Sequence, residues 1–109
     1  DAPRGESTAA VRQRVLAARQ RQLDRAGTLN AQLSQAQTEA ACPLRRAEQD
    51  LLEHAIEALQ LTSRATHRIL RIARTLADLA AVERIGHAHL AEAIGYRQLD
   101  RRAAVAAPG

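Results

Sequence analysis

Lysine is absent from this chain of 109 residues, and cysteine and aromatic residues each occur once, as Cys42 and Tyr96. Without lysine, the chain has no phosphate-binding loop of the G-x-x-x-x-G-K-[ST] kind, and no other glycine-rich loop replaces it. A single cysteine excludes an intrachain disulfide and a metal site built on cysteines, and it fits a reducing, cytoplasmic setting. No run of about 18 apolar residues occurs, so no membrane span is expected.

The residues that are present predict a small all-α domain. Hydrophobic residues make up 46% of the chain, and leucine, isoleucine, valine and alanine must fill the core. A core of this kind suits closely packed helices better than a sheet, where aromatic residues are favoured. Alanine and arginine dominate the composition, and both are good helix formers. We therefore expect one domain, a bundle of four to five helices, without a β-hairpin or an internal repeat.

Capping residues and apolar periodicity predict five helical segments. They are expected at about residues 8–26, 30–41, 45–60, 61–80 and 87–101, and the second is the weakest. Ser7 or Thr8 is the expected cap of the first helix, and Gly27 its end. Residues 8–101 form the expected domain, residues 1–7 a linker or cut end, and residues 102–109 a disordered tail.

The third and fourth segments carry the clearest apolar faces. On the third, Leu51, Leu52 and Ala55 belong to the expected inner stripe, and Glu48 is placed on the outer side. The apolar arc of the fourth covers roughly half of its circumference, which predicts a helix at the centre of the bundle. We place its polar residues on the outer side: Arg64, His67, Arg71, Arg74, Thr75 and Asp78. Arg74 and Asp78 are four residues apart and can pair.

Two arginines of the first segment, Arg12 and Arg19, lie between two apolar rows. Either their stems follow the edge of the core while their charged heads reach water, or this edge meets another protein surface. Both interpretations stay open, and the second makes Arg12 and Arg19 interface candidates. Arg14, Arg21 and Arg25 form another row, which is expected to face solvent.

Arg64 follows two capping residues, Thr62 and Ser63, in the first turn of the fourth segment. The helix dipole disfavours a cation there by roughly 0.3–1 kcal/mol. An arginine at such a position often meets an anion, and the guanidinium fork matches phosphate oxygens. The alternative is that an arginine-rich chain placed one there by chance.

The histidines and the net charge predict less. His87 and His89 are two residues apart and point in nearly opposite directions on a helix, and His54 and His67 lie on separate segments, so no metal site is predicted. The net charge of +4 permits contact with nucleic acid. However, the arginines are scattered and no aromatic platform for bases exists. A free-standing helical DNA-binding or adaptor module is therefore kept as an alternative.

Five segments carry a family resemblance: GESTAAVRQRVLAARQRQ, LNAQL, CPL, LTSRATHRILRIARTLADLA and HLAEAIGYRQLDR. In this order and at these separations, they resemble the C-terminal region of Mg-chelatase-like AAA+ ATPases of the ComM/YifB competence-protein type. The resemblance implies a helical lid that follows a nucleotide-binding core. It also implies that Arg64 is the sensor-2 arginine. The S-x-R-A segment of the family corresponds to Thr62-Ser63-Arg64-Ala65, with threonine in place of serine.

For the intact protein, the resemblance implies a hexameric ring that hydrolyses ATP with Mg²⁺ and acts on DNA during transformation and recombination. The P-loop, the Walker-B acid and the arginine fingers would precede Asp1, so the chain alone is expected neither to be an enzyme nor to bind a cofactor. Its expected partners are that core, the neighbouring subunits and, through the ring, DNA. The lid of a true magnesium chelatase, which drives metal insertion into a porphyrin, is the alternative, although NAQL and YRQLDR favour the ComM type.

Overall fold

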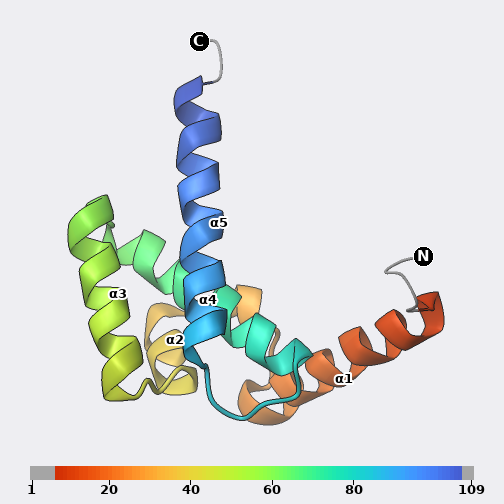
Figure 1. Cartoon of the computed structure of the whole chain (residues 1–109). Coiled ribbons are helices and arrows are strands. Elements are labelled where there is room, and N and C mark those ends of the chain that lie inside the picture. The colour runs from red at the N-terminus through yellow and green to blue at the C-terminus, as the bar shows by residue number, and fades with distance from the viewer. Residues whose placement is uncertain (1–6, 107–109) are drawn as a thin grey trace.

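The computed structural model describes the backbone of residues 7–106 and the side chains of residues 7–99. Five α-helices and one short 3-10 helix follow one another along this part of the chain (Figure 1). They are α1 (Thr8–Ala26), η1 (Asn30–Gln32), α2 (Gln35–Ala41), α3 (Arg46–Leu59), α4 (Ser63–Leu79) and α5 (His87–Ala106). No strand occurs within residues 7–106, and the predicted all-α class is confirmed.

Local capping explains where α1 begins and ends. The Ser7 hydroxyl accepts a hydrogen bond from the backbone N–H of Ala10 at 3.1 Å. At the other end, Gly27 adopts a left-handed conformation with φ of 74° and donates its N–H to the carbonyl of Leu23. Both are ordinary ways to satisfy the free backbone groups of a helix end. The predicted bounds of this helix are therefore confirmed.

The predicted helix over residues 30–41, the weakest of the five, is divided in two. The structure has a single 3-10 turn, η1, followed by an extended Leu33 with ψ of 138° and then by α2. Ser34 explains the interruption, because its hydroxyl accepts from the N–H of Gln37 while the Gln37 side chain accepts from the N–H of Ser34. This reciprocal capping box starts a new helix at Gln35.

Helix α5 is longer than predicted, since its backbone continues to Ala106. The division into a linker (1–7), a domain (8–101) and a tail (102–109) stays a prediction. Residues 1–6 and 107–109, at the two ends of that division, lie outside the described residues.

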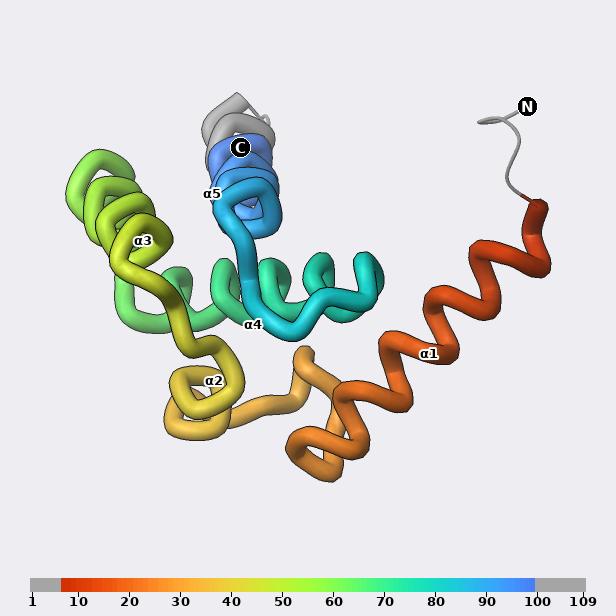
Figure 2. The backbone as a smooth tube through the Cα atoms, turned by 60° about the horizontal axis from the view of Figure 1, so that its bottom comes forward, coloured from red at the N-terminus to blue at the C-terminus, as the bar shows by residue number. Residues whose placement is uncertain are grey.

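Helix α4 is the centre of the arrangement. It contacts α1, η1, α2 and α5, while α3 packs against α5. Figure 2 shows α3 beside the first turns of α4, α5 crossing α4 near its middle and α1 at the other end of α4, with the start of α1 leading away from the body. The predicted central place of this helix is confirmed. None of the helices within the described residues is long and apolar enough to cross a membrane.

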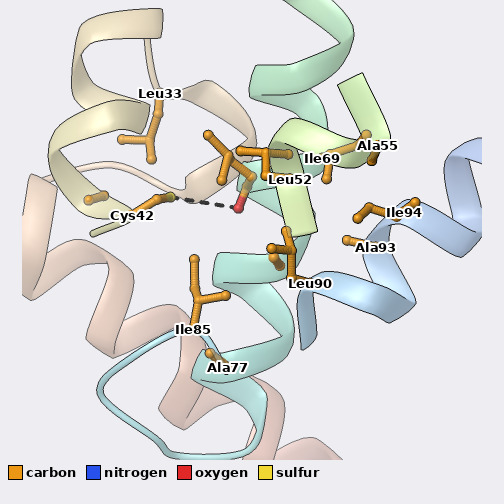
Figure 3. Packing of buried hydrophobic residues seen from close by; sticks show 13 residues of the cluster. Leu33, Cys42, Leu52, Ala55, Ile69, Ala77, Ile85, Leu90, Ala93 and Ile94 are labelled. Atoms are coloured by element: carbon orange, nitrogen blue, oxygen red, sulfur yellow. Dashed lines mark hydrogen bonds between the residues drawn. The ribbon is translucent and has the colours of Figure 1, made fainter. Parts of the chain in front are cut away.

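The core is built from aliphatic side chains, as the near-absence of aromatic residues requires. Figure 3 shows Leu52 of α3 and Leu90 and Ile94 of α5 gathered around Ile69 of α4. Alanines fill the closest approaches, and Ala73, Ala77 and Ala93 are fully buried. Small side chains at these positions allow α4 and α5 to pack closely, because interior side chains interdigitate at high density.

Cys42, directly after α2, belongs to this core and is 5% exposed. Its Sγ lies 3.6 Å from the carbonyl oxygen of Leu70 (Figure 3). Burial raises the pKa of the thiol from 9.0 to about 11. At neutral pH Cys42 is therefore a protonated, small hydrophobic side chain, and its predicted burial is confirmed.

Candidate functional site

The first turn of α4 is held by Thr62. Its Oγ1 accepts from the N–H of Ala65 at 3.1 Å, and its carbonyl accepts from the N–H of Thr66 at 2.9 Å. Of the two predicted capping residues, Thr62 is the cap and Ser63 is the first helical residue. Arg64 is thereby fixed as the second residue of the helix, where free N–H groups of the first turn remain close by.

The side chain of Arg64 is exposed, and it lines a small surface pocket of about 160 Å³. The pocket is also lined by Thr62, Ala65, Arg68 and Arg97. Ligand sites for whole small molecules span roughly 300–1,000 Å³. This pocket is therefore suited to an anionic group such as a phosphate rather than to a complete nucleotide.

Arg97 reaches the same pocket from α5. Its side chain is half-buried, and its Nε is buried without a hydrogen-bond partner. Arg97 was not predicted from the sequence to be a site residue. The only signal was its place in the YRQLDR segment of the family resemblance, and no spacing rule connects that segment with the start of α4.

The interface candidates Arg12 and Arg19 lie on α1, and neither lines the pocket with Arg64. Both are exposed. The apolar residues beside them are also exposed by two-fifths or more of their surface: Val11, Val15, Leu16 and Leu23. This half of α1 thus presents an apolar side edged by two arginines, and the structure leaves that side uncovered by the described part of the chain.

An ion-pair network joins α1 to α4, and its acid, Asp78, is buried in contrast to the prediction that it faces solvent. Arg25 is exposed as predicted, although its guanidinium pairs with Asp78. Asp78 is fully buried. Its carboxylate accepts from Arg25 Nη2 at 2.6 Å and Arg25 Nη1 at 3.2 Å, and also from Asn30 Nδ2 at 3.0 Å. The prediction was wrong because the donors lie 53 and 48 residues away in sequence, beyond the reach of any periodicity rule.

Arg74 is the second buried member of this network, and its predicted outer position was also wrong. It is 2% exposed, lies 3.3 Å from Asp78 and donates to the carbonyl oxygens of Ala41 and Val82. The predicted pairing of Arg74 with Asp78 is confirmed, although the pair is inside the domain. Burial lowers the pKa of the Arg74 guanidinium, and the nearby Asp78 carboxylate opposes that shift.

Two further polar residues are buried against prediction, Glu48 and His67, both 8% exposed. Glu48 lies one turn before Leu52 and two turns before Ala55, so it shares their inner face. The His67 ring is held between the carbonyl of Ser63, at 2.7 Å from Nδ1, and the carboxylate of Glu39, at 2.8 Å from Nε2.

Metal binding finds no support among residues 7–99, where no three His, Cys, Asp or Glu side chains form a group that could hold an ion. The histidines have other roles in the fold. His67 bridges α4 to Glu39 of α2. His89 Nδ1 accepts a hydrogen bond from the backbone N–H of Gly86 at 2.9 Å, just before α5 begins.

Comparison with known proteins places the chain among relatives that are much longer. It is 46% identical over 98 residues to the competence protein ComM of Haemophilus influenzae, which covers 90% of this chain and 19% of that protein. It is 41% identical over 100 residues to YifB of Salmonella typhimurium, and 43% identical over 97 residues to YifB of Escherichia coli, both described as uncharacterized. The matches cover 92% and 89% of this chain and 20% and 19% of those proteins, respectively.

The chain thus spans about a fifth of the length of these curated relatives. No solved structure matches it. A family model described as the C-terminal domain of magnesium chelatase subunit ChlI matches residues 5–97, which is most of the chain. The chain belongs to this family of magnesium chelatase C-terminal domains, with ComM and YifB among its relatives.

Proposed function

We propose that this domain is the helical lid of a ComM/YifB-type AAA+ ATPase and that Arg64 is its sensor-2 arginine. The observation that carries the proposal is the exposed position of Arg64 in the first turn of α4, beside a pocket lined by two more arginines. The pocket suits a phosphate and has no room for a nucleoside. The remainder of the nucleotide would be bound by the core of the complete protein.

In phosphoryl transfer, an arginine at this position would stabilise the negative charge of the phosphate groups. Negative charge on the γ-phosphate oxygens is best stabilised by fixed positive groups that need no reorganisation. A guanidinium can donate two parallel hydrogen bonds to these oxygens. Because the lid contacts the nucleotide only when it closes on the core, Arg64 would also couple the nucleotide state to the position of the lid.

In this proposal, the P-loop and the groups that bind Mg²⁺ lie in the core of the complete protein. Residues 1–109 contain no lysine for a P-loop, and no acidic residue is among the described residues that line the pocket. The core would therefore hold Mg²⁺ as well as ATP. The complete protein would work as a cytoplasmic, hexameric ring that acts on DNA during transformation and recombination.

The uncovered side of α1 is the part of the domain that we propose docks on the core or on the neighbouring subunit of the ring. It combines Val11, Leu16 and Leu23 with Arg12 and Arg19. Interfaces are commonly built from apolar residues and arginines, and charged residues at their edges steer association.

Reversing both charges, Arg12→Glu with Arg19→Glu in the complete protein, is expected to raise the concentration needed for half-maximal assembly about tenfold, or ~1.4 kcal/mol. Sedimentation velocity at several concentrations measures this shift. Arg45→Glu with Arg84→Glu is the control, since both residues are exposed on other parts of the domain. Equal assembly of the two double variants would show that this side of α1 is not an interface.

Binding of a non-hydrolysable ATP analogue to the complete protein tests the assignment of Arg64. Arg64→Ala is expected to weaken binding about tenfold, because a charge-assisted bidentate contact is lost. Arg84→Ala, in the exposed loop between α4 and α5, removes the same charge away from the pocket and should leave the affinity unchanged. If the two variants bind alike, Arg64 does not contact the nucleotide.

The family description itself favours a second candidate, the lid of a true magnesium chelatase. Both candidates use Arg64 in the same way and differ in what the ATPase drives. ATP turnover of the complete protein distinguishes them: stimulation by branched DNA supports the ComM-type function, and dependence on a porphyrin-binding subunit supports the chelatase.

A further inference from the structure

The function proposed above assigns a task to Arg64 and leaves Arg97 without one. Arg97 belongs to α5, yet its side chain lines the pocket at the start of α4. Its Nε is buried and has no hydrogen-bond partner. Leaving a buried charged donor unsatisfied costs free energy, so such a group calls for an explanation. The Nε of Arg74 is also buried without a partner, but Arg74 is enclosed by the domain. Arg97 differs because its side chain is only half-buried and lines an open pocket, where a ligand can reach the rest of its guanidinium.

The positive charge around the pocket also favours an anionic ligand. Three guanidinium groups, from Arg64, Arg68 and Arg97, line it, and none of its described lining residues is acidic. The amino-terminal end of the 17-residue helix α4 adds partial positive charge at Thr62 and Ser63. A small concave site with one sign of charge concentrates ions of the opposite sign.

We propose that Arg97 is a second ligand of the nucleotide triphosphate and binds phosphate oxygens beside those contacted by Arg64. The inference rests on the proposed function and adds a residue to its site. Because Arg64 and Arg97 come from different helices, the triphosphate would bridge α4 and α5. Because Arg97 is half-buried, its side chain is held in place before the nucleotide binds, and we expect it to hold the triphosphate equally in the ground state and the transition state.

Steady-state ATP hydrolysis by the complete protein tests this role. An interaction that is equally strong in both states affects KM and leaves kcat nearly unchanged. Arg97→Ala is therefore expected to raise the KM for ATP about tenfold and to change kcat less than threefold. Arg97→Lys should restore part of the affinity, because lysine keeps the charge and loses the fork. Arg84→Ala is the control, because it removes the same positive charge outside the pocket and should leave the KM for ATP unchanged.

A direct measurement on the present chain does not depend on the core. Titration with inorganic tripolyphosphate should shift the Nε–H resonance of Arg97 in an NMR spectrum and leave that of Arg84 in place. The dissociation constant should rise at least fivefold in Arg97→Ala. Circular dichroism melting shows whether the Arg97→Ala variant is folded. If the variant does not fold, the shift of the Arg97 resonance in the unsubstituted chain alone shows whether Arg97 binds tripolyphosphate.

The outcomes separate this inference from the proposed function. If Arg64→Ala impairs the ATPase while Arg97→Ala leaves KM within twofold and the Arg97 resonance does not move, Arg97 is not a ligand and the proposed function stands. If neither variant affects nucleotide binding or hydrolysis, both proposals are overturned. A raised KM together with a shifted Arg97 resonance supports both.

Discussion

Replacing Asp78 with alanine is expected to lower the free energy of unfolding by about 3–5 kcal/mol, which removes much of the stability of a domain of this size. Asp78 is fully buried, accepts hydrogen bonds from Arg25 and Asn30, and forms an ion pair with Arg74. Without the carboxylate, the Arg74 side chain, 2% exposed, would be left as an uncompensated buried charge. The side chain of Arg25, which is 27% exposed, can still turn toward water, so Arg74 dominates the expected loss.

Denaturant unfolding of the chain, followed by circular dichroism, measures this loss. Asp50→Ala is the matched control, because Asp50 pairs with Arg46 at 3.2 Å on the surface, where the two side chains are 61% and 87% exposed. Exposed pairs of this kind contribute less than about 1 kcal/mol. Similar losses in the two variants would show that the buried network does not hold α1 against α4.

Replacing Arg64 with alanine in the complete protein is expected to reduce kcat for ATP hydrolysis by about 100-fold. Removal of one fixed donor that stabilises transition-state charge typically has an effect of about 10²–10³-fold on kcat. The expected loss exceeds the change in nucleotide affinity, because the proposed sensor-2 role has the guanidinium interact most strongly with charge that develops as the γ-phosphate departs. Initial rates at saturating ATP measure it.

Two comparisons make the turnover experiment specific. Arg64→Lys should recover only a small part of the rate, because an ammonium group cannot reproduce the bidentate fork. The melting temperature of the present chain should be unchanged by Arg64→Ala, since the side chain is exposed. Full activity of a folded Arg64→Ala protein would remove this arginine from the mechanism.

Capping and periodicity were sufficient to predict α1, α3 and α4, because the signals lie within a few residues of each helix end. Ser7, Gly27 and Thr62 act where the sequence places them. The second helix was predicted wrongly because Ser34 was taken as a helical residue, although its capping box with Gln37 starts a new helix. A serine followed three residues later by glutamine is a recognisable signal for such a start.

The interior polar contacts could not be predicted in the same way. Asp78 and Arg74 look like an exposed i,i+4 pair, and Arg25 looks like one of several solvated arginines of α1. The burial of Asp78 and Arg74, and the pairing of Asp78 with Arg25, depend on how α1 crosses α4, which is a property of tertiary packing. The same limit explains why Arg64 could be proposed as a site residue from its helix start and Arg97 could not, since only the packing of α5 on α4 brings the two together.

The central claim is that Arg64 of this domain contacts a nucleotide bound by another part of the complete protein. The most direct test is a structure of the complete protein with a non-hydrolysable ATP analogue and Mg²⁺. We expect the Arg64 guanidinium within hydrogen-bonding distance, about 2.7–3.2 Å, of a β- or γ-phosphate oxygen. A closed complex in which Arg64 faces solvent or another protein surface, while a different residue occupies that position, would contradict the account.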